Sequence, residues 1–262
     1  MTFTIMVFLL VAMSTVPGGE AYLTIGIPVV SRPSVGINYF KYSISTVLRG
    51  LRASDTRIVI FVSETNHTIQ REIGRHLHRF HQHFLDRNII NICTVNPDVY
   101  PEPRTVEKFT NEGFQRQKWR IRQSLDYATL FHIVRDDSEY YLHLEDDVIC
   151  EKDYLLDIRK FIVEQGGSWT LLEFSEQGFI GKLLHGSSLD HLARYIWMFR
   201  KEAPVDWLLM RFRGIQKDRR IYRGRILFHH IGLYSSLVGQ IRKDAYRISR
   251  NTAGKNSTSW VG

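Results

Sequence analysis

The chain has 262 residues, of which 44% are hydrophobic, so it can bury the core of one large α/β domain or two small ones. Its composition excludes a disordered or fibrous protein. The formal net charge of +8 would suit nucleic-acid binding, but lysine and arginine are spread along the chain. No zinc-finger, homeodomain or RNP pattern is present, so we expect no nucleic-acid partner. The two basic segments, 116–122 and 211–225, instead favour an anionic small molecule.

The N-terminus carries a short apolar run. Residues 3–13 contain no charged side chain, and the run extends to Val16. It is shorter than the roughly 20 residues of a transmembrane helix and is typical of a signal-peptide core, with small residues that would allow cleavage after Ala21. Because no lysine or arginine precedes it, an uncleaved anchor and a truncated sequence remain alternatives. We therefore predict a signal peptide or short anchor at 1–21 and a route into the secretory pathway.

Two tripeptides that begin at Asn66 and Asn256 match the N-glycosylation acceptor pattern and agree with secretory routing. Cys93 and Cys150 could form one disulfide bond or remain buried thiols, and the sequence does not decide between them. Five histidines between positions 67 and 83 show no ligand spacing, so we interpret them as part of a polar helix face.

Apolar runs and helical segments then alternate along the chain. Strands are expected at 22–30, 57–64, 88–95 and 139–145, and helices at 39–51, 68–84 and 114–134. A fifth strand at 169–175, helices at 188–202 and 204–212, and a late strand at 225–232 follow. This alternation predicts an α/β fold with a single mostly parallel sheet and helices on both faces.

Three consecutive carboxylates, Glu145, Asp146 and Asp147, end the fourth predicted strand. Ligands of parallel sheets collect beyond the carboxyl ends of the strands. A hard divalent cation such as Mg²⁺ or Mn²⁺ would relieve the mutual repulsion of these acids, and such a cation typically stabilises a departing phosphate or diphosphate. The alternative is a charged turn that caps the next helix. Together with the basic segments, the pattern favours a sugar transferase with a nucleotide-sugar donor.

Six blocks in chain order resemble the catalytic domain of the alpha-1,3-mannosyl-glycoprotein 4-beta-N-acetylglucosaminyltransferases. They are LTIGIPVV (23–30), WRIRQSLDY (119–127), YYLHLEDDVI (140–149), WTLLEFSEQGFIGKLL (169–184), MFRKEAPVDWLL (198–209) and LFHHIGLYSSLVGQI (227–241). The resemblance spans residues 22–243 and leaves 244–262 as a C-terminal tail. It implies a GT-A type fold, a UDP-GlcNAc donor, a Mn²⁺ ion and a place in the Golgi lumen or membrane. The implied reaction transfers GlcNAc in β1,4 linkage to the α1,3-mannose arm of N-glycans, with inversion.

The resemblance also implies roles for the acids. Asp147, the last acid of the motif, would bind the metal, and His230 would complete the metal site. Glu145 and Asp146 would lie near the ribose, the sugar hydroxyls or the waters of the ion. The alternative for His230 is an ordinary histidine at a strand end, and strand alternation directs His229 to the opposite face.

Inverting transfer needs a carboxylate that takes the proton of the acceptor hydroxyl. Asp206 resembles the base of a related GlcNAc-transferase in its Asp-Trp placement, although an aspartate near a helix start is also favourable for capping. Glu173 is the rival base, or a ligand of the hydroxyls of the donor sugar.

Arg120 and Arg122 are two positions apart, so they do not share a helix face. We expect one of them to reach the diphosphate or uracil and the other to cover the surface. Gly178 and Gly181 would permit a tight loop close to a ligand, or serve only a turn.

The chain departs from the family in its length. A long stem and a C-terminal lectin-like domain are not expected, and the segment after Trp207 lacks a cysteine-containing insertion associated with the family. A catalytically weak or inactive member that binds and regulates other Golgi glycosyltransferases is therefore the alternative function. A metal-dependent phosphohydrolase would show more paired Asp/His clusters than this chain has.

Overall fold

The computed structural model describes residues 21–32, 35–51, 55–95, 100, 113–166 and 168–237. The predicted C-terminal tail, the sequon at Asn256 and nearly all of the predicted signal or anchor lie outside these residues. Within the described part, none of the helices has the length and apolar character that a bilayer crossing requires.

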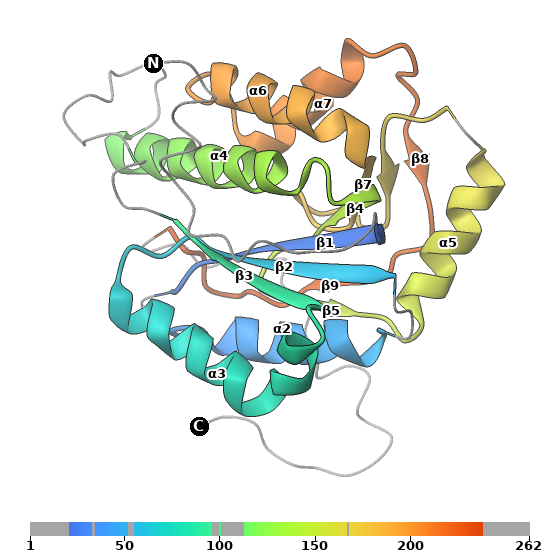
Figure 1. Cartoon of the computed structure of the whole chain (residues 1–262). Coiled ribbons are helices and arrows are strands. Elements are labelled where there is room, and N and C mark those ends of the chain that lie inside the picture. Colours follow the sequence, from blue (N-terminus) through green and yellow to red (C-terminus); the bar gives the residue numbers. More distant parts are fainter. Residues whose placement is uncertain are drawn as a thin grey trace.

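A seven-stranded sheet in the order β3-β2-β1-β4-β7-β6-β8 lies at the centre of the fold (Figure 1). Its parallel half consists of β1 (Ala21–Val29), β2 (Thr56–Val62), β3 (Ile90–Thr94) and β4 (Ser138–His143). The other half consists of β7 (Lys182–His185), which is antiparallel to β4 and β6, then β6 (Leu172–Glu173) and β8 (Tyr222–Arg223). A second, antiparallel sheet pairs β5 (Val148–Cys150) with β9 (Phe228–His230).

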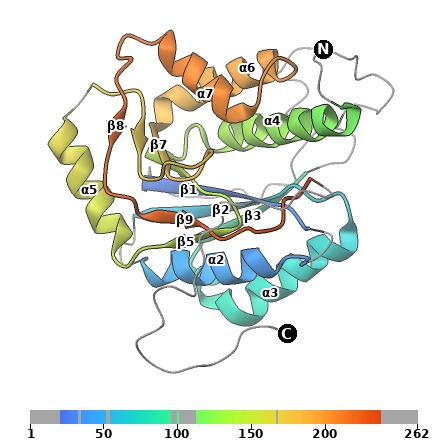
Figure 2. The same ribbon diagram turned by 180° about the vertical axis from the view of Figure 1, so that it is seen from behind.

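Helices cover both faces of the large sheet (Figures 1 and 2). One face carries α2 (Asn38–Arg49) and α3 (His67–Asp86), and the other carries α4 (Phe114–Val134), α6 (Leu189–Phe199) and α7 (Val205–Gly214). The buried side of α5 (Tyr154–Gln165) joins the core of the first face, and a short 3₁₀ turn, η3 (Gly186–Ser188), precedes α6.

The apolar strands fill two separate cores because alternate side chains point to opposite faces. In β2, Ile58 and Ile60 belong to the core under α2 and α3, whereas Val59 and Phe61 belong to the core under α4, α6 and α7. This burial on both sides explains why the parallel strands read as continuous apolar runs. The predicted α/β class, with a mostly parallel sheet flanked by helices, is confirmed.

The short strands differ from the prediction. Only Leu172 and Glu173 of the predicted fifth strand form β6, because the amide of Phe174 already bonds the carbonyl of Gly181 at 2.9 Å across a loop. The strands β5 and β7 span three and four residues, which is too short for a periodic pattern to identify. The predicted late strand at 225–232 is present, but only Phe228–His230 form β9.

The two cysteines are both free thiols. Cys93 packs in the core on one face of the sheet, and Cys150 packs against the core on the other face. Burial raises the pKa of the Cys93 thiol to about 11 and that of the Cys150 thiol to about 12. The two side chains therefore behave as inert core residues, and the disulfide alternative is excluded.

Candidate functional site

The acidic residues lie in the turn between β4 and β5, at the carboxyl end of the parallel strands. The amide of Leu144 continues the ladder to the carbonyl of Gly26 at 3.0 Å, and the acids follow directly. The amide of Val148 then donates to the hydroxyl of Ser43 on α2 at 2.9 Å. Because β5 pairs with β9, Val148 lies opposite His230, which brings this late histidine to the acidic turn.

Glu145, Asp147 and His230 each offer a ligand atom, and these atoms all lie within 4.8 Å of one another. The Nε2 atom of His230 is 3.2 Å from Oδ1 of Asp147 and 3.6 Å from Oε2 of Glu145. The hydroxyl of Tyr127 donates to Oε1 of Glu145 at 2.9 Å and fixes that side chain. Carboxylate oxygens with one imidazole nitrogen form a donor set that suits Mn²⁺. The structure thus brings Asp147 and His230 together as expected, and it adds Glu145 to the set.

Gly232 allows the chain to pass close to this group. A Cβ atom added there would lie 2.0 Å from Oδ2 of Asp147 and 2.9 Å from Cε1 of His230. The segment after β9 therefore requires glycine at this position. It packs against the acids through a hydrogen bond from the amide of Ile231 to the carbonyl of Asp147 at 2.8 Å.

The acids also determine the charge of His230. Burial disfavours the imidazolium, but the carboxylates of Asp147 and Glu145 outweigh it and raise the pKa of His230 to about 9. The position between these carboxylates therefore attracts positive charge. His229 points away, as predicted, and its Nε2 atom lies 2.9 Å from Oε1 of Glu151.

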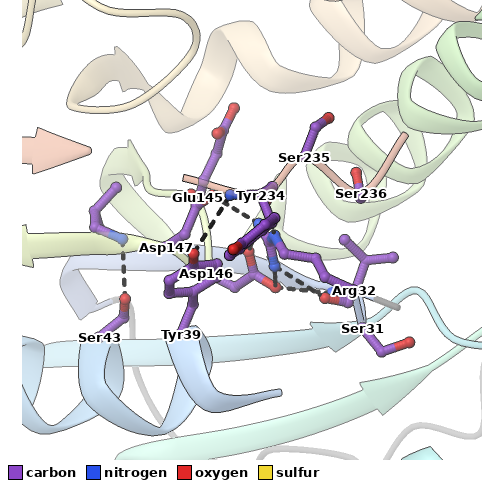
Figure 3. A network of polar contacts seen from close by, with 12 residues as sticks. Ser31, Arg32, Tyr39, Ser43, Glu145, Asp146, Asp147, Tyr234, Ser235 and Ser236 are labelled. Atoms are coloured by element: carbon purple, nitrogen blue, oxygen red, sulfur yellow. Dashed lines mark hydrogen bonds and ion pairs between the residues drawn. The ribbon is translucent and has the colours of Figure 1, made fainter. Parts of the chain in front are cut away.

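Arg32 is the site residue that the sequence reasoning missed (Figure 3). It follows β1, is only 5% exposed, and its guanidinium contacts both Asp146 and Asp147. A charged residue directly after a buried parallel strand, at the edge of the sheet where the acids also lie, is the signal that would have identified it.

Two cavities meet at the acidic turn. The larger, about 690 Å³, is lined by Glu145, His230, Gly178, Arg120 and Asp206, among others. The smaller, about 120 Å³, is lined by residues from the ends of β1 and β2, from α4 and from the turn, including Val30, Ser63, Arg122, Asp126 and Asp146. Glu145, Trp119 and Gln123 line both cavities. The candidate metal group therefore lies where a ligand in one cavity could extend into the other.

Asp206 reaches the larger cavity from a different element. It lies in the first turn of α7, which begins after Pro204, and its side chain is half-buried. Its neighbour Trp207 lines the same cavity and is 62% exposed. Asp206 thus lines the cavity from α7 and does not belong to the acidic turn, so it could take part in a different chemical step from the three acids.

Glu173 lies elsewhere. It is buried in β6, where Oε1 is 3.0 Å from Nζ of Lys182 and Oε2 is 3.3 Å from Nε of Arg223. It is not among the residues that line either cavity. Of these two carboxylates, Asp206 lines one of the two cavities and Glu173 lines neither.

The two arginines of α4 line different cavities. Arg120 lines the larger one, and its Nη2 donates to the carbonyl of Lys201 at 3.2 Å. Arg122 lines the smaller one, donates to the carbonyl of Ser63, and lies 4.5 Å above the ring of Tyr100. The expectation that one of them covers the surface is wrong. Arg120 is 2% exposed and Arg122 is half-buried, because α4 packs between the sheet and α6.

The loop between β6 and β7 contains the predicted glycines. Gly178 has φ +47° and lines the larger cavity, where an added Cβ would lie 3.9 Å from Oε1 of Glu145. Gly181 has φ +65°, and its added Cβ would meet Phe228 at 2.7 Å. The tight loop expected from the sequence is therefore present, and Gly178 lies close to Glu145.

Asp126 is a buried carboxylate that should make the stability of the protein depend on pH. Burial raises its pKa to about 7, although the hydroxyl of Tyr100 and the guanidinium of Arg122 act in the opposite direction. An unfolded aspartate titrates near about 4, so between about pH 4 and pH 7 the unfolded chain loses this proton before the folded protein does. We expect the wild type to lose free energy of unfolding relative to Asp126→Asn over this range, by on the order of a few kcal/mol. Above about pH 7, the difference in free energy of unfolding between the wild type and Asp126→Asn should stay constant.

Urea denaturation of both proteins from pH 4 to pH 8 checks this expectation. A difference between the two free energies that does not change with pH would contradict it.

Comparison with known proteins identifies the family. The family model described as the MGAT4 conserved region matches residues 9–246. The alpha-1,3-mannosyl-glycoprotein 4-beta-N-acetylglucosaminyltransferase C of Macaca fascicularis is 33% identical over 229 residues, which are 86% of this chain and 48% of that protein. The alpha-1,6-mannosyl-glycoprotein 4-beta-N-acetylglucosaminyltransferase of Gallus gallus is 40% identical over 168 residues, 63% of this chain and 36% of that protein.

The chain thus spans about half or less of the length of these relatives. Among solved structures, mouse xyloside xylosyltransferase 1 aligns with a TM-score of 0.48 and 8% identity, over 78% of this chain and 85% of that chain. The family match covers most of the chain, including the acidic turn, Asp206 and His230, and the protein therefore belongs to the MGAT4 conserved-region family.

Proposed function

We propose that the chain is a metal-dependent transferase that moves GlcNAc from UDP-GlcNAc, in β1,4 linkage and with inversion, to the α1,3-mannose arm of N-glycans. One observation carries the proposal: a single cavity is lined by Glu145 and His230 of the candidate metal group and by Asp206 from a separate helix. The names of the relatives support the sugar and the linkage.

On this proposal the donor occupies both cavities. The nucleoside lies in the smaller one beside Arg122, and the sugar lies in the larger one beside Gly178 and Arg120. The diphosphate between them lies at Glu145, which lines both cavities, and so beside Asp147 and His230. A divalent cation held by these three residues, Mn²⁺ on our proposal, would neutralise charge on the diphosphate leaving group.

The acceptor enters the larger cavity, and Asp206 is the base. Its carboxylate takes the proton of the acceptor hydroxyl as that oxygen forms a bond to the anomeric carbon. The bond from this carbon to the diphosphate oxygen breaks on the opposite side, and UDP leaves with the electron pair. Displacement of this kind inverts the anomeric configuration. Asp206 stands on α7, apart from the acids of the turn, so the carboxylate that removes a proton differs from those that hold the cation.

We infer secretory routing and transfer in the Golgi lumen from the same membership. The sequon at Asn66 is compatible with this location, because Asn66 is exposed at the start of α3.

Trp207 is expected to hold the acceptor by stacking against an apolar sugar face. Replacement by alanine should raise the acceptor KM by about 3- to 10-fold, the loss expected for one aromatic contact, and leave the donor KM unchanged. Initial-rate kinetics with each substrate varied in turn measures both constants. Met198→Ala is the matched control, because Met198 is 64% exposed on α6 and does not line this cavity. An equal rise in both KM values would contradict the assignment.

Transfer itself is tested by incubation with UDP-GlcNAc, Mn²⁺ and a biantennary N-glycan. We expect a product heavier by one GlcNAc, absent in EDTA, with the new residue on the α1,3 arm by tandem mass spectrometry. A product on the α1,6 arm would revise the acceptor, for which the name of the chicken relative gives a reason. No product, together with no binding of UDP, would overturn the transferase and favour a member that binds and regulates other Golgi glycosyltransferases.

A further inference from the structure

We propose that Arg32 is a positioning residue of the cation site. Its guanidinium engages Asp146 and one oxygen of Asp147, and thereby directs the other oxygen of Asp147 toward Glu145 and His230. The proposal depends on the proposed function only for the identity of the ion. Its consequences concern the orientation of side chains that the structure shows.

The contacts divide the oxygens of the two aspartates (Figure 3). Nη2 of Arg32 lies 2.7 Å from Oδ1 of Asp146 and 2.7 Å from Oδ2 of Asp147, and Nη1 lies 3.0 Å from Oδ2 of Asp146. Oδ1 of Asp147 is the atom that faces His230, at 3.2 Å from its Nε2. The rotation of the Asp147 carboxylate is therefore set by Arg32 on one side, while its other side belongs to the candidate metal group.

Every N–H group of the guanidinium has an acceptor. Besides the three contacts to aspartate, Nη1 donates to the carbonyl of Val30 at 3.1 Å, and Nε donates to the carbonyl of Tyr234 at 3.1 Å. Five donors in one planar fork are a property of arginine alone, because lysine offers three donors from a single nitrogen. The residue type at this position is thus demanded by its surroundings.

Tyr39 also contacts the guanidinium. Its ring lies 5.2 Å from Cζ of Arg32, and its hydroxyl accepts from the amides of Leu233 at 3.1 Å and Tyr234 at 3.4 Å. Arg32 therefore contacts the end of β1, the acidic turn and the segment after β9, and Tyr39 of α2 packs against it. Loss of the guanidinium would remove the contact that orients Asp147, together with those to Asp146 and Tyr234.

The formal charge of the acidic turn also supports this role of Arg32. The three carboxylates of the turn carry a formal charge of minus three, and the guanidinium of Arg32 reduces the sum to minus two. A divalent cation neutralises that sum. Without Arg32 the buried carboxylate of Asp146 would be unpaired, which is costly in a buried site and would favour its protonation or displacement.

The role of Asp146 follows from these contacts. Both of its oxygens accept hydrogen bonds from Arg32, and Oδ2 also accepts from the amide of Val30 at 3.0 Å. Although Asp146 lines the smaller cavity, it is not part of the group of possible metal ligands. On this proposal Asp146 acts through Arg32 and holds the guanidinium against Asp147.

The test is Mn²⁺ binding by calorimetry, without donor or acceptor, for the wild type and Arg32→Lys. We expect the affinity for Mn²⁺ to fall by about 10- to 100-fold, the usual loss when a partner of a metal ligand is removed. The half-activating Mn²⁺ concentration in the transfer assay should rise by the same factor. Arg159→Lys is the matched control, because Arg159 also combines an ion pair, 2.7 Å from Asp55, with a ring contact, 4.1 Å from Tyr22, and lies outside the site. It should bind Mn²⁺ as the wild type does.

A folded Arg32→Lys variant with wild-type affinity for Mn²⁺ would overturn the proposal, even if its melting temperature falls. If Arg32→Lys does not fold by circular dichroism, Asp146→Asn tests the same contact and should lower the affinity for Mn²⁺ about 10-fold. Wild-type affinity in Asp146→Asn would then overturn it. The proposed function fails separately if the wild type binds Mn²⁺ and donor but transfers no sugar. If the wild type binds no Mn²⁺, the cation site itself is refuted.

Discussion

Replacement of Asp206 by asparagine is expected to lower kcat by about 10²- to 10⁴-fold, the usual contribution of a general base. An amide of the same size cannot take the proton of the acceptor hydroxyl. Asp206 lies on α7 and not in the acidic turn, so the KM for UDP-GlcNAc and the affinity for Mn²⁺ should stay close to wild type. Initial rates with a biantennary N-glycan, together with a calorimetric titration of UDP, separate these quantities.

Glu202→Gln is the matched control for this prediction. Glu202 also lines the larger cavity, but its side chain is 48% exposed and lies 3.8 Å from Arg211. We expect at most a small change in kcat. If Asp206→Asn keeps near-normal turnover while a folded Glu173→Gln variant loses it, the base is Glu173 and the assignment from cavity geometry is wrong.

Asp147→Asn is expected to abolish measurable transfer. The substitution removes the central charge of the candidate metal group and leaves an amide between Arg32 and His230. Loss of metal-assisted stabilisation of the leaving group costs several kcal/mol, which corresponds to at least about 10³-fold in rate. Unlike Asp206→Asn, this variant should also lose Mn²⁺-dependent binding of UDP. Metal titration of activity and calorimetry of UDP binding measure the two effects.

Glu151→Gln provides the control for Asp147. Glu151 and His229 form a carboxylate–imidazole pair of similar length, 2.9 Å, between the chain just after β5 and the strand β9, but outside the acidic turn. We expect wild-type binding of Mn²⁺ in this variant. Retention of Mn²⁺ binding by Asp147→Asn would show that the cation site lies elsewhere.

The α/β fold could be predicted from the sequence because its parallel strands are buried on both faces. β1 and β2 appear as continuous apolar runs, and α4 begins and ends at the predicted residues, Phe114 and Val134. The late strand that contains β9 was predicted, but the strands β5 and β7 and the pairing of β5 with β9 could not be predicted. Their pairing depends on long-range contacts between very short segments.

Some residues of the candidate site could be predicted and others could not, again because long-range contacts are not visible in the sequence. Asp147 and His230 stood out because their residue types and the resemblance of their blocks pointed to one chemistry. Arg32 offered only a weaker signal, a charged residue just after a buried parallel strand. Its role depends on the adjacency of β1 and β4, which only the strand order shows.

Glu173 shows a second limit of the sequence. A carboxylate at a strand end resembles a catalytic group in the sequence, but the structure directs it to Lys182 and Arg223. Ion-pair partners contributed by other strands cannot be read from local spacing.

A calorimetric titration of UDP-GlcNAc into the whole chain, with Mn²⁺ and with EDTA, tests the proposed donor site directly. We expect one donor site per chain that is saturable in the presence of Mn²⁺ and is lost both in EDTA and in Asp147→Asn. Absence of binding under all conditions, or binding unchanged by EDTA and by Asp147→Asn, would contradict a donor site built on Glu145, Asp147 and His230.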